Sequence, residues 1–139
     1  MTGVSRELGA DGTVVLRAGG CTFSYRRLRA GALEILIEGI DNGQFGTATL
    51  DELSLALMRD RPLELFVDAS AASMPAVAVS KEWTRFFSLN QKDFRRVSVL
   101  VSSKSVQLTM AIAQHLSQTG RLIQIYTDAD VYRARSAGN

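Results

Sequence analysis

The sequence predicts a single α/β domain with a mixed, mostly parallel sheet, an N-terminal hairpin and helices mainly on one face of that sheet. Strand-like apolar runs alternate with amphipathic helical segments through the second half of the chain, at the spacing of right-handed parallel crossovers. Two short β-like runs come before them and are separated by Gly19 and Gly20, which is typical of a tight hairpin turn. With 139 residues, the chain is long enough for one domain with a substantial core.

The helices and strands are predicted from the spacing of apolar residues along the chain and from the turn-forming residues between the apolar segments. We expect residues 1–12 to be a flexible lead-in and residues 13–139 to form the domain. Strands are predicted at 13–17, 22–27, 33–38, 63–68, 94–101 and 121–127, and helices at about 50–59, 80–89, 104–119 and 129–135. The glycine-rich stretch 39–46 is predicted to be a loop.

Two helix starts carry recognisable capping residues. Thr49 and Glu52 form a T-x-x-E pattern, which predicts a capping box at the first helix. Asp128 or Asp130 is expected to cap the short final helix, because a carboxylate accepts hydrogen bonds from otherwise unpaired N–H groups.

The central strand runs predict an asymmetric sheet. One face of each run is wholly apolar, whereas the other face mixes charged and apolar residues. The apolar faces are Leu33, Ile35 and Ile37, then Leu63, Leu65 and Val67, and finally Val97, Val99 and Val101. Sheets covered by helices on both sides have nearly continuous apolar strands, so this pattern predicts one face that stays partly open.

Charge and cysteine content exclude several classes of protein. The formal net charge is +2, so there is no strong overall field. Arg26, Arg27 and Arg29 form the densest basic group, but strand alternation separates them and no recognition helix accompanies them, so we expect no nucleic-acid partner. The single Cys21 favours a reducing, cytoplasmic location, and the absence of an apolar run of about 18 residues argues against membrane insertion.

No motif for catalysis or for a cofactor is present. The phosphate-binding and dinucleotide-binding glycine patterns are missing, and one histidine, His115, with one cysteine does not make a zinc site. We therefore expect no enzyme activity, no catalytic residue, no metal and no cofactor. Asp68 is the acidic residue to examine, because it ends a strand and is followed by Ser70; this Asp-x-Ser pattern either caps a turn or contacts a ligand.

The aromatic residues Trp83, Phe86 and Phe87 share one broad helix face. They pack in the core, line a subunit interface or surround an apolar pocket, and the sequence leaves these alternatives open. The following helix is apolar over a wide arc, which suggests a second contact such as a homodimer.

Two short motifs resemble the STAS-like family of anti-sigma-factor antagonists and sulfate-transporter tails. Residues 36–41 (LIEGID) are similar to its first core strand and Gly-x-Asp turn, and residues 65–70 (LFVDAS) to the strand that ends in Asp-x-Ser. The resemblance covers the element order from about 33 to 134 and implies a bacterial-type regulatory domain. The family's phosphorylatable serine motif is not matched, because residues 75–79 read PAVAV and the hydroxyls of Ser70, Ser73 and Ser80 lie outside it.

The leading functional hypothesis is a non-catalytic regulatory or protein-interaction domain that binds a protein partner or a second copy of itself. The alternative, based on the aromatic helix, is a carrier or sensor of a small apolar ligand or lipid. The candidate binding residues are Asp68, Ser70, Ser73, Trp83 and Phe87.

Overall fold

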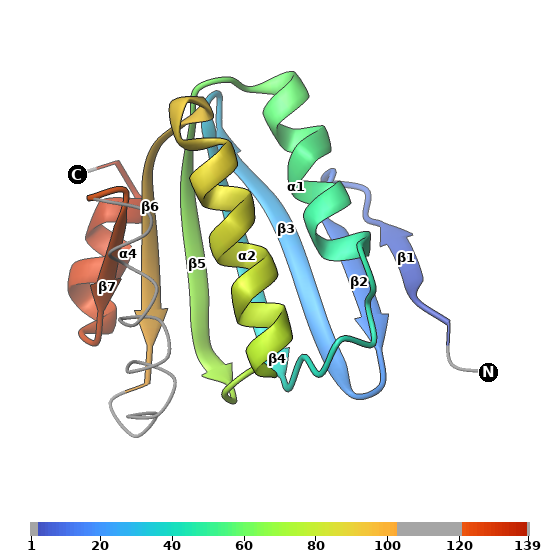
Figure 1. Ribbon diagram of the computed structural model, residues 1–139. Helices are drawn as coiled ribbons and strands as arrows, with labels where there is room; N and C mark the ends of the chain where they lie inside the picture. The colour runs from blue at the N-terminus through green and yellow to red at the C-terminus, as the bar shows by residue number, and fades with distance from the viewer. Residues whose placement is uncertain (1–2, 103–120, 139) are drawn as a thin grey trace.

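The computed structural model describes residues 3–102 and 121–138, which form one seven-stranded sheet with helices packed on it (Figure 1). The strands follow one another across the sheet in chain order. The elements are β1 (Ser5–Leu8), β2 (Val14–Ala18), β3 (Cys21–Arg29), β4 (Ala32–Gly39), α1 (Ala48–Arg59), β5 (Leu63–Ala72), α2 (Val77–Leu89), the 3-10 helix η1 (Gln91–Asp93), β6 (Phe94–Val101), β7 (Ile123–Tyr126) and α4 (Ala129–Ser136).

The sheet is mixed, as predicted. Neighbouring strands from β1 to β4 are antiparallel, and those from β4 to β7 are parallel. α1 connects β4 to β5, and α2 together with η1 connects β5 to β6. The carboxyl ends of β4 and β5 therefore meet at one edge of the sheet, which is where ligands bind in open α/β sheets.

One strand lies in the segment that was predicted to be a flexible lead-in. β1 pairs with β2, with Ser5 opposite Arg17 and Leu8 opposite Val14. Arg6 of this strand also forms an ion pair with Glu52 of α1 at 2.8 Å. All four residues of β1 are exposed, so the alternation of buried and exposed residues that reveals a strand is missing from its sequence. Because of β1, the antiparallel part of the sheet is larger than predicted.

The core lies mainly on one face of the sheet. A large cluster gathers the inward side chains of β2 to β6 together with those of α1 and α2, and Figure 1 shows both helices on the same side. On the opposite face, a much smaller cluster of four buried residues joins α4 to the sheet. Tyr132 of α4 packs there with the strand residues Ala32, Phe66 and Leu100. This arrangement confirms the prediction that the helices lie mainly on one face.

The capping box predicted for the first helix is wrong. α1 begins at Ala48, so Thr49 lies inside the helix, where it is buried and its carbonyl accepts a hydrogen bond from the Tyr25 hydroxyl at 2.8 Å. Glu52 pairs with Arg6 and not with the helix start. The predicted cap of the last helix is confirmed, because the Asp128 carboxylate accepts hydrogen bonds from the backbone N–H groups of Asp130 and Val131.

The other strand and helix predictions differ from the structure only at their ends. β5 continues to Ala72 and α2 begins at Val77, each a few residues beyond the predicted bounds. The helix predicted at 104–119, with its wide apolar arc and His115, lies outside the described residues.

Candidate functional site

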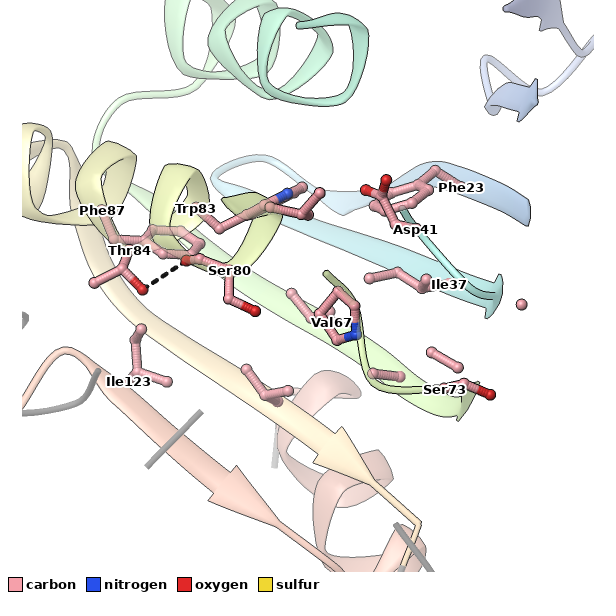
Figure 2. Close-up of a pocket in the computed structure, with 16 residues that line it drawn as sticks. Phe23, Ile37, Asp41, Val67, Ser73, Ser80, Trp83, Thr84, Phe87 and Ile123 are labelled. Carbon is pink, nitrogen blue, oxygen red and sulfur yellow. Dashed lines mark hydrogen bonds between the residues drawn. The ribbon is translucent and has the colours of Figure 1, made fainter. Parts of the chain in front are cut away.

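An apolar cavity of about 140 Å³ lies between α2 and the sheet (Figure 2). Its floor comes from the central strands, which point their apolar faces toward the helix, and its roof comes from α2. The lining residues are Phe23, Ile37, Gly39, Asp41, Val67, Ala69, Ala72, Ser73, Pro75, Val79, Ser80, Trp83, Thr84, Phe87, Val99 and Ile123.

Aromatic rings form one wall of the cavity. Trp83 stacks on Phe23 with a centroid distance of 6.1 Å and an interplanar angle of 20°, and it lies 5.9 Å from Phe87. Phe87 continues the contact to Phe94 at 5.3 Å. These centroid distances are within the range of favourable aromatic pairs, so the rings stabilise one another's positions. The aromatic helix face seen in the sequence therefore serves both the core and a pocket.

The two ends of the cavity differ in polarity. Ser73 directly follows the carboxyl end of β5, and Asp41 lies close to the carboxyl end of β4. Ile123 begins β7 at the opposite edge of the sheet. Figure 2 shows Asp41 and Ser73 toward one end, and Phe87 and Ile123 toward the other. Thr84 also lies toward the second end, but its hydroxyl donates to the backbone carbonyl of Ser80 at 2.8 Å and is thereby satisfied.

Asp41 is the acidic residue of the cavity lining, and the sequence analysis did not select it as a candidate. Its exposed fraction is 6%, and its carboxylate accepts one hydrogen bond, from the backbone N–H of Gly43 at 2.9 Å. Burial raises the pKa of the Asp41 carboxyl above its ordinary value; the hydrogen bond from Gly43 opposes this change and the nearby charge of Glu82 adds to it. Its position just after a parallel strand was the available signal, since ligands bind at such positions.

Backbone hydrogen bonds join the two strand ends that surround this polar end. The N–H of Ser73 donates to the carbonyl of Gly39 at 2.9 Å, and the N–H of Ala76 donates to the carbonyl of Asp41 at 3.0 Å. Gly39 has a φ of +94°, and a Cβ there would lie 2.5 Å from the carbonyl oxygen of Gly20. Only glycine fits this close approach, so Gly39 determines how β4 leaves the sheet beside the cavity.

The five candidate binding residues do not form one site. Ser73, Trp83 and Phe87 line the cavity, whereas Asp68 and Ser70 do not. The Asp68 carboxylate accepts hydrogen bonds from the backbone N–H and the hydroxyl of Ser70, at 3.1 and 2.6 Å. Asp68 also lies 4.0 Å from the guanidinium of Arg133 on α4. The expectation that Asp68 ends a strand is wrong, because Asp68 and Ser70 both lie inside β5, where the pairing with β4 has a register shift.

The partly open face of the sheet holds paired polar groups. The Tyr132 hydroxyl donates to Glu34 at 2.9 Å, and Arg26 forms an ion pair with the same carboxylate at 2.9 Å. Burial, together with the charge of Glu34, raises the pKa of the Tyr132 hydroxyl. Glu34, Tyr132 and Arg26 are therefore paired with one another on this face.

Groups suited to metal binding are not assembled in the described part of the chain. Residues 3–102 and 121–138 contain no cluster of three or more histidine, cysteine or acidic side chains. Cys21 is buried, and burial together with the charge of Asp41 raises the pKa of its thiol to about 11. A thiol of this kind is a poor nucleophile. No helix in these ranges is long and apolar enough to cross a membrane.

Comparison with known proteins supports the fold. No protein-family model and no curated protein matches the chain. A solved structure from Shewanella loihica PV-4, an uncharacterised protein from the DUF3478 family with a SpoIIAA-like fold, is similar with a TM-score of 0.52 and 12% sequence identity. The match covers 97% of this chain and 94% of that one. The chain therefore has the SpoIIAA-like, or STAS-like, fold that its two strand motifs predicted.

Proposed function

We propose that this chain is a non-catalytic binding module of the STAS-like type, and that it carries or senses a small apolar molecule in the cavity beneath α2. The observation that supports this most directly is the cavity itself, which has apolar walls and an aromatic side formed by Phe23, Trp83 and Phe87. Pockets for small molecules are usually concave and apolar, with few polar groups. The single cysteine is consistent with action in the cytoplasm.

The volume of the cavity limits what it holds. An engineered apolar protein cavity of about 150 Å³ binds benzene and stays dry when empty. At about 140 Å³, this cavity accepts a molecule of similar size. It therefore suits a small aromatic or short-chain compound, and an extended lipid would need the cavity to widen.

Tryptophan fluorescence offers a direct test, because Trp83 is the only tryptophan and it lines the cavity. Titration with benzene and with indane should change its emission saturably, with the tighter binding for benzene. Ala69→Leu fills the cavity from its floor and should abolish the change, because Ala69 is buried and lines the pocket. Ala71→Leu, on the same strand but exposed and outside the lining, is the matched control and should leave binding intact. Binding that survives in Ala69→Leu would refute the proposal.

A second candidate function is a protein-interaction domain that is regulated without the family's phosphorylatable serine. The residues before and at the start of α2, 75–79, carry no hydroxyl. Three large apolar side chains are exposed around the polar end of the cavity: Ile40 at 43%, Met74 at 41% and Val77 at 59%. They are close in space, because the hydrogen bonds from Ser73 and Ala76 join the segments that carry them. Exposed apolar groups of this kind mark interaction surfaces.

The partner that can be tested directly is a second copy of this chain. If these three residues form a homodimer interface, sedimentation velocity of the wild-type protein should show a concentration-dependent dimer that Val77→Ser weakens. Leu89→Ser, at the other end of the same helix and also exposed, is the matched control. A monomer at all concentrations would reject the homodimer.

A further inference from the structure

A second cleft, of about 470 Å³, lies at the edge of the sheet where β3 ends and where β5 and β6 begin. Its charged lining residues are Arg29, Glu64, Arg95, Arg96 and Arg135, and Gly138 completes it. These residues come from four separate elements and from the chain end, so the sequence alone does not show them as a group. We propose that this cleft binds a compact polyanion that carries several phosphate groups.

The charge balance of the cleft is the first argument. Four guanidinium groups and one carboxylate leave a net charge of +3 in the cleft, although the whole chain carries only +2. The charged side chains outside the cleft, 12 basic and 13 acidic, sum to −1, so the cleft carries more net positive charge than the chain as a whole. A concave site with one sign of charge raises the local concentration of ions of the opposite sign.

The ion pairs within the cleft do not satisfy its arginines. Arg29 and Arg95 approach the same oxygen of Glu64 at 4.0 and 3.9 Å, which is the outer limit of an ion pair. Among the residues that the structure describes, Arg96 and Arg135 have no acidic partner within that limit. By contrast, in the neighbouring hollow Arg59 and Arg61 pair with Asp60 and Asp93 at 3.3 Å. Two of the four arginines of this cleft therefore have no acidic partner in the described part of the chain, whereas Arg59 and Arg61 beside it are paired.

The geometry of Arg29 indicates a site that is partly organised in advance. One of its guanidinium nitrogens donates to the carbonyl of Ser136 at 2.8 Å, and the group lies against Gly138. This hydrogen bond joins the end of β3 to the end of α4 and keeps the guanidinium beside the cleft. An arginine held in this way loses less side-chain entropy when it binds an anion.

Phosphate groups fit this donor set best. A guanidinium presents its N–H groups as a planar fork that matches the oxygens of phosphate and carboxylate. Four such forks around one cleft suit an anion with several charges in a small volume. An extended nucleic acid is disfavoured, because it needs a continuous excess of basic groups along its backbone and the charged side chains outside the cleft sum to −1.

Titration calorimetry of the full chain with tripolyphosphate tests this proposal. In low salt the wild-type protein should bind with a Kd below about 1 mM, and the binding should weaken as the salt concentration rises. The double variant Arg96→Gln/Arg135→Gln should lose affinity by about tenfold or more, because it removes the two arginines without an acidic partner. The control Arg17→Gln/Arg85→Gln removes the same charge from outside the cleft and should change affinity by less than about threefold.

Equal losses in the two double variants, or no saturable binding by the wild type, would overturn the proposal. The site can also be located without any variant. Arginine Nε–Hε signals of the wild-type protein, followed by NMR during the titration, should shift for Arg29, Arg95, Arg96 and Arg135. Shifts confined to other arginines would reject the cleft even if tripolyphosphate binds. Neither result depends on the apolar cavity.

Discussion

Replacement of Gly39 by alanine tests how closely β4 must approach the start of β3 beside the cavity. Two separate costs follow from the structure. The φ of +94° is unfavourable for any residue with a Cβ, at roughly 1–2 kcal/mol. In addition, the new Cβ would lie 2.5 Å from the carbonyl oxygen of Gly20 and 3.1 Å from the Cα of Cys21, and backbone atoms cannot move aside as a flexible side chain can.

The second cost is a steric one. Overpacking of this kind costs roughly 1–3 kcal/mol, so the total loss should be about 2–5 kcal/mol. Since small domains are stabilised by only about 5–15 kcal/mol, this is a large fraction of the total. The strain falls where Gly39 accepts the hydrogen bond from Ser73, so the polar end of the cavity should also be distorted.

Gly12→Ala is the matched control, because Gly12 has a similar φ of +86° but a Cβ there would meet no atom within 4 Å. It should lose only the conformational cost of roughly 1–2 kcal/mol. Urea unfolding followed by circular dichroism measures both variants, and with an m-value of roughly 1–3 kcal/mol per M the midpoint for Gly39→Ala should fall by about 1 M or more. If the two variants lose the same stability, the steric argument is wrong.

Three further predictions concern buried polar groups. The Ser98 hydroxyl is buried without a hydrogen-bond partner among the described residues, so Ser98→Ala should raise the free energy of unfolding by about 1 kcal/mol in urea titrations; a loss of stability would show that the hydroxyl is bonded. Because the pKa of Asp41 is raised in the folded protein, its contribution is most favourable below the unfolded pKa and is lost as the pH rises through the folded pKa. Asp41→Asn keeps an acceptor for Gly43 and should therefore raise Tm at pH 7 but not at pH 3, and an equal change at both would contradict this linkage. The Cys21 thiol, with its pKa raised to about 11 and its exposed fraction of 1%, should react with a disulfide reagent at pH 8 only after unfolding; rapid reaction of the native protein would refute its burial.

The central part of the fold could be predicted because its residues carry local signals. β4, β5 and β6 each have an apolar face with a period of two, and this pattern predicted both the strands and the helices that cover one side. β1 was missed because it contributes no buried residue, and its position depends on backbone pairing with β2. The capping box at Thr49 was wrong because tertiary contacts with Tyr25 and β1 determine where that helix begins.

The candidate sites were less predictable than the fold, because they join residues that are distant in the sequence. The aromatic helix face was recognised, yet the sequence could not decide whether Trp83 and Phe87 fill the core or leave a pocket. Asp68 was expected, like Asp41, at the end of a parallel strand, but it lies inside β5, and strand alternation directs it to the other face. The arginine cleft depends on the sheet order, which brings residue 29 next to residues 95, 96 and 135.

Because the core is divided unequally, the helices should differ in how readily they open locally. α4 is attached through a cluster of only four buried residues, whereas α1 and α2 belong to the large one. Local openings have lower free energies where fewer apolar contacts must be broken. The amide protons of α4 should therefore exchange with deuterium well before those of β5. Each local opening of α4 also moves Arg135 away from the other arginines of the cleft. The density of positive charge at that edge of the sheet therefore varies with time.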